Sequence, residues 1–497
     1  MHIPVEGTGP VDHRLRRRAA AALQGALPPG AVLVEDEDTR PYECDGLSIY
    51  RQSPMLVVLP ETEEQVATTL RTCSSLGLPV VPRGAGTGLS GGALPHSGGV
   101  LLSLAKLSAI LEIDPRARTA RVQTGARNLA ISEAAAAHGL FYAPDPSSQI
   151  ACTIGGNVAE NSGGVHCLKY GLTGNNVLAV RGLTIGGEPV TIGSAALDSP
   201  GLDLLSVVLG SEGMLLVVTE VLVKLMPKPA CARCIMASFG DVEVAGKAVA
   251  AVIAAGVIPA GLEMMDQAAT RMVEPFVHAG YDLNAAAILL CESDGTAEEV
   301  AEEIARMSEI LRAAGATRIS VSANEAERLR FWAGRKNAFP AAGRVSPDYY
   351  CMDGTIPRRH LGHVLRAIRE MEQKYALACP NVFHAGDGNL HPLILFDAND
   401  PGSVERAEAF GADILELCIA VGGTVTGEHG VGIEKINQLC LQFDAPTREA
   451  FFGVRRAFDP HGLLNPGKAI PTLHRCAEFG RLHVHQGRIP FPTLPRF

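Results

Sequence analysis

Apolar and polar residues along the first part of the chain follow strand-like and helix-like patterns in turn. The apolar run MLVVLP at 55–60 predicts a strand, and Thr62 with Gln65 fits a capping box that begins a helix. The run LPVV at 78–81 predicts the next strand. Two further short strands are expected at 100–104 and 119–124. The first domain is therefore predicted to mix α and β structure.

The pattern changes near residues 227–229. The elements predicted after this point are a strand at 235–238, a helix at 242–255, a strand near Leu262, a strand at 287–291 and a long helix at 297–314. This order favours a second, α+β domain of ferredoxin-like type.

Glycine-rich loops return late in the chain, at 384–391 and 422–432, so we expect its last part to pack against the first domain. The expected organisation is an N-terminal helical segment (1–54), a first mixed α and β domain (55–228), a second, α+β domain (229–425) and a C-terminal segment (426–497) that packs on the first domain.

Composition narrows the possible functions. The chain has 497 residues, 47% of them hydrophobic, and a formal net charge of −10 without a long basic run. Nucleic acid held through phosphate contacts is therefore not an expected partner. A small anionic substrate needs a local cationic pocket.

Targeting and metal-cluster signals are weak. The start of the chain has no apolar core of signal-peptide length, and the longest apolar stretch, 248–264, is broken by glycines and a proline. We expect a cytoplasmic protein whose membrane contact is peripheral. The single CxxC, Cys231 and Cys234, lacks the second pair that a zinc ribbon or an iron–sulfur cluster needs, so free thiols are expected there.

Glycine-rich runs indicate a nucleotide cofactor. In RGAGTGLSGG (83–92) three glycines satisfy the GxGxxG fingerprint, but the glycines and prolines that follow leave no room for the helix of a Rossmann fold. Backbone amides in such a loop can still converge on a pyrophosphate. Similar runs lie at 144–171 and 210–220. One such run is explained by a tight turn, whereas three in one domain favour a cofactor.

These three runs, in this order, resemble the loops of the vanillyl-alcohol-oxidase-type (PCMH-type) FAD domain. The resemblance implies an FAD bound noncovalently, since the first loop has no histidine for a covalent link. It also implies that the FAD is lined by Arg83, Gly84, Ala85, Gly86, Thr87, Gly88, Leu89, Gly91, Pro144, Cys152, Thr153, Gly155, Gly156, Asn157, Ser162, Gly163, Gly164, Glu212, Gly213 and Asn465.

Two later motifs carry ligands for a metal. HAGDGNLHP places His384 and His391 around a glycine-rich turn that also holds Asn389, and TGEHGVG supplies Glu428 and His429. Two imidazoles and a carboxylate suit a divalent transition metal with positions left open for substrate; zinc, manganese and iron all remain possible. Histidines that only form hydrogen bonds in loops are the alternative.

The two motifs resemble those of the FAD-linked D-2-hydroxy-acid dehydrogenases. The resemblance implies that His384, His391 and Glu428 hold the metal, that His429 is the base, and that Asn389 belongs to the catalytic group. An alcohol proton has to leave while the α-hydrogen departs as hydride to flavin, so a Lewis acid and a neutral imidazole both lower the barrier.

A cation is needed for the substrate carboxylate. The segment FWAGRKNAFPAAGR offers Arg335, Lys336 and Arg344, of which Arg335 is the predicted clamp; a solvated basic helix face is the alternative. Relatives that act on dicarboxylic acids carry a lysine where this chain has Cys351. A small monocarboxylate is therefore expected, glycolate first and D-lactate second, because one methyl group discriminates weakly.

The resemblance covers nearly the whole chain and implies electron transfer to a second FAD-domain subunit and an iron–sulfur subunit. The histidines and cysteine of the tail (His474, Cys476, His483 and His485) are expected to dock to such a partner. Two other functions remain open. A noncatalytic flavin subunit would not need the histidine motifs, and an NADPH-dependent flavin reductase would need an adenosine-phosphate site instead.

Overall fold

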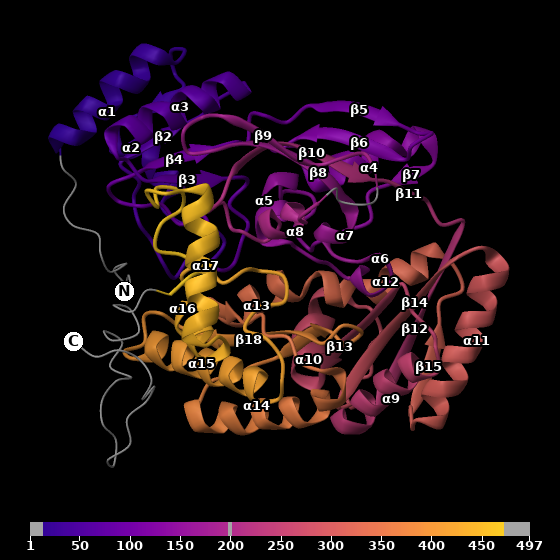
Figure 1. The fold of residues 1–497 in the computed structure, drawn as a ribbon. Helices are drawn as coiled ribbons and strands as arrows, with labels where there is room; N and C mark the ends of the chain where they lie inside the picture. The colour runs from indigo at the N-terminus through magenta and orange to yellow at the C-terminus, as the bar shows by residue number, and fades with distance from the viewer. Residues whose placement is uncertain (1–12, 197–200, 472–497) are drawn as a thin grey trace.

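The computed structural model describes residues 13–196 and 201–471, and Figure 1 shows two sheet-containing halves stacked on one another. The first sheet has the order β1-β2-β4-β3, with β2, β4 and β3 parallel and β1 antiparallel. Its strands are β1 (Val32–Leu33), β2 (Leu56–Val58), β3 (Val80–Arg83) and β4 (Val100–Ser103). Strand β1 lies in the N-terminal segment that the sequence predicted to be helical.

The second sheet of the upper half is antiparallel, in the order β5-β6-β10-β8-β9. Its strands are β5 (Ile110–Asp114), β6 (Thr119–Gln123), β8 (Val177–Leu183), β9 (Pro189–Gly193) and β10 (Val217–Lys224). A two-stranded ribbon of β7 (Leu140–Phe141) and β11 (Met226–Pro227) lies beside it.

The helices of the upper half differ in length, and one of the longest is capped at both ends. The longest are α1 (His13–Ala26) and α3 (Glu63–Leu76). The Thr62 side chain accepts a hydrogen bond from the Gln65 amide, and Gly77 ends α3 in the left-handed region. The predicted capping box is only half formed, because the Gln65 side chain accepts from the Glu61 amide and not from the Thr62 amide. The short helices are α2 (Asp36–Thr39), α4 (Asn128–Ala135), α5 (Ile154–Glu160), α6 (Cys167–Tyr170), α7 (Thr173–Asn176) and α8 (Leu204–Val208).

The lower half is built on a seven-stranded antiparallel sheet in the order β15-β12-β14-β13-β17-β18-β16. Its strands are β12 (Cys231–Phe239), β13 (Gly261–Asp266), β14 (Ala287–Gly295), β15 (Arg318–Val321), β16 (Asp348–Cys351), β17 (Asn381–His384) and β18 (Asn389–Phe396). One face packs against α9 (Val242–Ala254), α11 (Ala297–Ala313), α14 (Leu361–Tyr375) and α15 (Ser403–Ala420). The other face packs against α10 (Gln267–Val277), α12 (Glu325–Lys336) and α13 (Ala338–Val345), and α12 and α13 lie between the halves in Figure 1.

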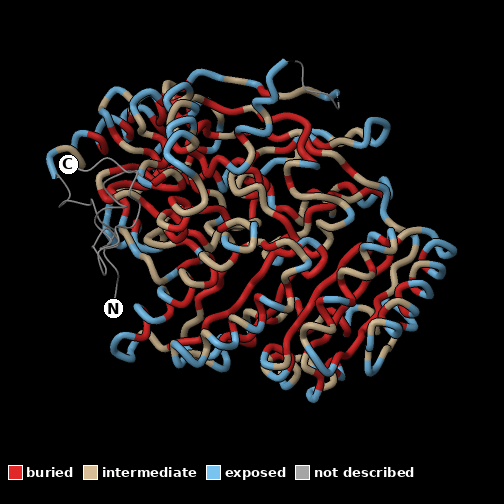
Figure 2. The backbone as a smooth tube through the Cα atoms, turned by 60° about the horizontal axis from the view of Figure 1, so that its bottom comes forward, coloured by how far each residue is buried: buried red, intermediate tan, exposed pale blue. Residues whose placement is uncertain are grey.

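The chain returns to the upper half after α16 (Ile436–Gln442) and α17 (Ala445–Phe458). Leu464 bridges Val80 of β3 in parallel, and the Asn465 amide donates to the Val80 carbonyl at 2.8 Å. Figure 2 shows buried backbone running through both halves, with exposed segments at the outer turns. The expected α+β fold with a returning C-terminal segment is confirmed.

None of the helices within 13–196 and 201–471 is long and apolar enough to cross a membrane. Cys231 and Cys234 are free thiols on β12, and Cys440 is disulfide-bonded. The predicted docking residues of the tail, His474 to His485, lie outside the described residues.

Candidate active site

A cavity of about 550 Å³ lies between the two halves, where the glycine-rich runs meet. Most of the predicted cofactor-binding residues line it: Arg83, Gly84, Ala85, Gly86, Thr87, Gly88, Leu89, Cys152, Thr153, Gly155, Gly156, Asn157, Ser162, Glu212 and Gly213. No helix forms between β3 and β4, so the first glycine run does not begin a Rossmann helix, as the sequence predicted. An ideal Cβ on Gly88 would meet no protein atom closer than 4.0 Å and would instead occupy cavity space.

The other predicted cofactor residues do not line the cavity but support its wall. Asn465 donates to the carbonyls of Gly92 and Glu212, and the Pro144 carbonyl accepts from Asn128. The rest of this group are Gly91, which packs against Ile433, Gly163, whose amide donates to Glu428, and Gly164, which abuts Asp145. The second glycine run also differs from a pure loop, because Gly155 and Gly156 lie within helix α5.

The hairpin of β17 and β18 brings the two predicted metal-binding histidines together. His384 pairs with Asn389 across the ladder, and His391 pairs with Val382, so that His384 and His391 are diagonal neighbours on one face. Their rings lie edge to face with centroids 5.0 Å apart. The seven-residue spacing is therefore the spacing of a hairpin.

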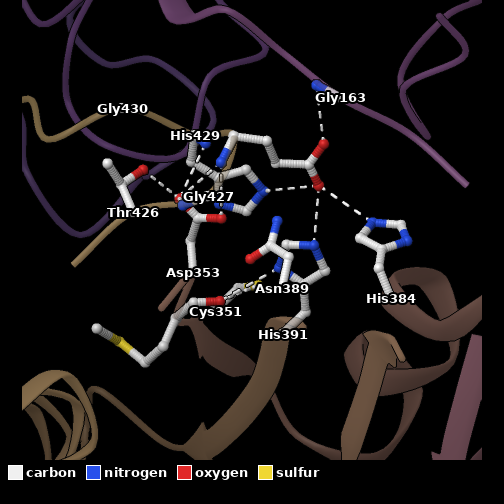
Figure 3. Close-up of polar contacts among 12 residues, drawn as sticks. Gly163, Cys351, Asp353, His384, Asn389, His391, Thr426, Gly427, His429 and Gly430 are labelled. Atoms are coloured by element: carbon white, nitrogen blue, oxygen red, sulfur yellow. Dashed lines mark hydrogen bonds and ion pairs between the residues drawn. The ribbon is translucent and has the colours of Figure 1, made fainter. Parts of the chain in front are cut away.

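Glu428 lies at the centre of this cluster. Its Oε1 is 2.8 Å from His391 Nε2, 3.3 Å from His384 Nε2 and 4.0 Å from His429 Nε2, and dashed lines in Figure 3 mark these contacts. Its Oε2 accepts from the Gly163 amide at 3.0 Å. Burial alone would raise the pKa of Glu428, but the hydrogen bonds from His384 and His391 hold it well below its usual range.

The far nitrogens of both histidines are also held. His384 Nδ1 donates to Glu263 Oε1 at 2.7 Å, and His391 Nδ1 is 3.4 Å from the Met352 carbonyl. This arrangement leaves each Nε2 directed at the carboxylate, which is the geometry of imidazoles that ligate a metal through Nε2 and are oriented by an outer acceptor. The donor set of His384, His391 and Glu428 fits a divalent ion, since one ligand atom from each lies within 4.8 Å of the others.

His429 follows Glu428 in a loop that is anchored by Asp353. The Asp353 carboxylate accepts from the backbone amides of Gly427, Glu428 and His429, at 3.2, 3.2 and 2.9 Å. The His429 ring lines the cavity, stacks on His391, and leaves Nδ1 buried without a partner. Burial lowers the pKa of His429 to about 4 although Asp353 opposes the shift, so the imidazole is neutral near pH 7.

Arg335 lies in the last turn of α12 and is fully buried while lining the cavity. Its Nε donates to Glu263 Oε2 at 2.7 Å, and its Nη2 is 3.5 Å from His384 Nε2. Glu263 therefore joins the predicted clamp to the histidine cluster. Of the two other candidate cations, Lys336 lines the same cavity, whereas Arg344 stacks on the Phe276 ring.

Asn389 and Cys351 border the cluster without lining the main cavity. The Asn389 side-chain oxygen is buried and has no hydrogen-bond partner. Cys351 ends β16, close enough to His391 and His429 for one ligand atom from each to lie within 4.8 Å of the others. It also lines a second cavity of about 240 Å³, which shares Leu89 with the first.

Sequence reasoning missed the carboxylates that hold the site together. Glu263 lies on β13 and Asp353 just after β16, and both are buried. Glu263 did leave a signal, because it is a charged residue between the apolar residues Leu262 and Met264. Asp353 left none, because its partners come from a loop more than seventy residues later.

Comparison with known proteins gives matches along most of the chain. The model of an FAD binding domain matches residues 54–193, and that of the C-terminal domain of FAD linked oxidases matches residues 228–469. The glycolate oxidase subunit GlcD of Escherichia coli K12 is 62% identical, over 97% of both chains. A D-lactate dehydrogenase of Anaerostipes hadrus is 31% identical, over 90% of this chain and 96% of its own.

Among solved structures, p-cresol methylhydroxylase with substrate bound is similar with a TM-score of 0.80. It shares 17% identity and covers 93% of this chain and 98% of its own. At that identity the likeness concerns the fold alone, and it confirms the PCMH-type fold expected from the sequence.

Proposed function

The chain belongs to the family of FAD-linked oxidases, and from this we propose that it oxidises glycolate to glyoxylate by moving a hydride from the α-carbon to FAD. One observation carries the proposal. His391, Glu428 and His429 line the same cavity as the glycine-rich loops, so a substrate at these side chains lies against the cofactor-binding wall. A noncatalytic flavin subunit would have no use for this arrangement.

FAD, when bound, accepts the hydride. A divalent ion held by His384, His391 and Glu428 would polarise the substrate hydroxyl, and zinc, manganese and iron all accept such ligands. The neutral ring of His429 accepts the hydroxyl proton. Arg335 binds the substrate carboxylate through its Nη atoms, because its Nε is committed to Glu263.

D-lactate is the second candidate substrate. The Anaerostipes relative is a D-lactate dehydrogenase, and a methyl group changes binding by only ~1 to 3 kcal/mol in a pocket. The choice of glycolate depends on the higher identity to the Escherichia coli subunit and on Cys351, which provides no second cation for a dicarboxylate.

The electrons leave FAD through other proteins. The relative from Escherichia coli is named as a subunit, and the single CxxC of this chain does not supply the ligands of an iron–sulfur cluster. We therefore infer a second FAD-domain subunit and an iron–sulfur subunit as partners, and peripheral contact with a membrane through them.

The test is anaerobic mixing of the purified protein with glycolate, D-lactate, L-lactate, D-2-hydroxyglutarate and NADPH, while the flavin absorbance is followed. Glycolate should bleach the flavin fastest, with D-lactate next. Bleaching by NADPH and by none of the hydroxy acids would contradict the proposal.

A further inference from the structure

Two neighbouring acids on strand β14 receive side chains from the FAD-binding half. His166, two residues after the Gly163–Gly164 pair, places Nε2 3.2 Å from Glu292 Oε1, while its Nδ1 contacts Asp145 at 2.7 Å. Lys169 contacts Asp294 at 2.5 Å, and Tyr170 donates to the same carboxylate at 2.7 Å. Both contacts join the halves at the same strand.

Only the Glu292 contact continues into helix α12. Glu292 Oε2 accepts from Arg328 Nη1 at 2.7 Å and from the Trp332 indole. Arg328 and Trp332 are four residues apart on α12 and share one face of the helix. Arg335, the predicted carboxylate clamp, lies three residues after Trp332 on the same helix.

Helix α12 packs tightly against the sheet around the Glu292 carboxylate. Glu292 pairs with Gly261 across the β13–β14 ladder, and a Cβ on Gly261 would lie 3.1 Å from the Trp332 ring. The His166 and Trp332 ring centroids are 6.1 Å apart. Glu292 therefore lies directly against the helix that carries Arg335.

The loop that carries His166 also touches the metal-ligand side of the site. Gly163 donates its amide to Glu428, and Ser162 lines the cavity. One loop of the FAD-binding half is thus connected to both groups that receive the substrate, Glu428 directly and Arg335 through Glu292 and α12.

We propose that His166 is a positioning residue, which fixes helix α12 and its Arg335 relative to the flavin-binding loop by holding Glu292. The inference rests on the proposed function, because Arg335 has a substrate to bind only there. Lys169, whose contact ends at Asp294, joins the same two halves without this role.

The charge on His166 supports the assignment. Burial alone would lower the pKa of His166, but Asp145 and Glu292 overcome it and raise the pKa to about 10. Burial likewise would raise the pKa of Glu292, and His166 and Arg328 lower it instead. The two side chains form an ion pair in which Glu292 stays charged under α12.

The experiment compares His166→Ala with the matched control Lys169→Ala in the FAD-loaded protein. KM for glycolate in flavin reduction should rise on the order of tenfold to a hundredfold in His166→Ala, since a clamp displaced by about 1 Å loses that much. Lys169→Ala should change KM by less than about twofold. The two substitutions should nevertheless lower Tm by similar amounts, because each removes one contact between the halves. His166→Gln, which keeps the size but not the charge, should lie between them.

A second readout does not depend on activity. Trp332 is the only tryptophan of the chain. Its fluorescence therefore reports the surroundings of helix α12 where the helix contacts Glu292. The emission maximum should shift in His166→Ala and not in Lys169→Ala at matched FAD content. Equal KM values and equal spectra in the two variants would overturn the inference, whereas a wild-type protein that no hydroxy acid reduces would overturn the proposed function.

Discussion

Glu428 occupies a position where a single carboxylate oxygen faces three imidazoles. Both His384 and His391 are held at Nδ1 by outer acceptors, so their Nε2 atoms are already oriented before any ligand arrives. His429 differs, because its Nδ1 has no partner and its ring lies at the cavity. We therefore expect His384 and His391 to be metal ligands and His429 to be the base.

This division predicts different losses from two similar substitutions. His384→Ala should remove the metal together with flavin reduction, because it deletes a ligand whose orientation Glu263 provides. His429→Ala should slow flavin reduction by about 10²- to 10⁴-fold and leave metal and FAD bound. Elemental analysis, flavin absorbance and stopped-flow reduction of the two variants check this.

The assignment has two outcomes that would contradict it. Metal lost from His429→Ala would make that residue a ligand. Full reduction rates in a verified metal-free sample of the wild type would remove the metal from the reaction.

At the scale of elements, local motifs and long-range partners differ in how far they can be predicted. The β17–β18 hairpin keeps His384 and His391 seven residues apart in one short segment, so their pairing is visible in the sequence. Glu263 and Asp353 reach the site only because the seven-stranded sheet places β13 and β16 on either side of that hairpin. Strand order in a sheet follows from tertiary packing, which a single sequence does not display.

The glycine run that forms helix α5 also has a long-range contact that the sequence does not predict. Its composition predicted a cofactor wall, and Gly155 and Gly156 do line the cavity. The sequence did not predict that Gly155 is needed for a different reason. Its Cα faces Thr124 of the neighbouring segment, and an ideal Cβ would lie 1.7 Å from Thr124 Oγ1 and 3.0 Å from the Thr124 carbonyl oxygen.

Gly155→Ala should therefore destabilise the protein even without FAD. The clash has to be relieved inside a packed core, at a cost of ~1 to 3 kcal/mol in the free energy of unfolding. Gly156→Ala is the matched control, since its Cβ would meet only Thr153 Oγ1 at 3.5 Å and alanine favours the helix by about 1 kcal/mol. Thermal unfolding of the two apo variants measures the difference, and an equal Tm would show that Thr124 yields without cost.

At the scale of the whole molecule, the upper half and the returning chain meet at two buried glutamates. Glu212 accepts hydrogen bonds from the amides of Val431 and Gly432 at 2.7 and 2.8 Å, in the loop that carries His429. Glu160 faces the same loop, because a Cβ on Gly430 would lie 1.9 Å from Glu160 Oε2, an atom that has no hydrogen-bond partner. Two carboxyl groups therefore share one buried junction.

That junction makes stability depend on pH in a defined direction. Burial, and then repulsion from Glu212, raise the pKa of Glu160 well above its usual value. An unfolded glutamate ionises near pH ~4.3, so above this pH the folded state binds more protons than the unfolded state, and the free energy of unfolding falls as pH rises. Glu160→Gln removes the ionisable group and should raise Tm relative to the wild type at about pH 8.

The difference in Tm between Glu160→Gln and the wild type should shrink toward about pH 5. At that pH Glu160 of the folded wild type still holds its proton and resembles the glutamine. Glu302→Gln, on the exposed face of α11, is the control and should show no such difference. A Glu160→Gln protein with the same Tm as the wild type at both pH values would mean that the junction accepts two charges without cost. The lysines at the junction, Lys435 and Lys468, would then carry the compensation, because both lower the pKa of Glu160.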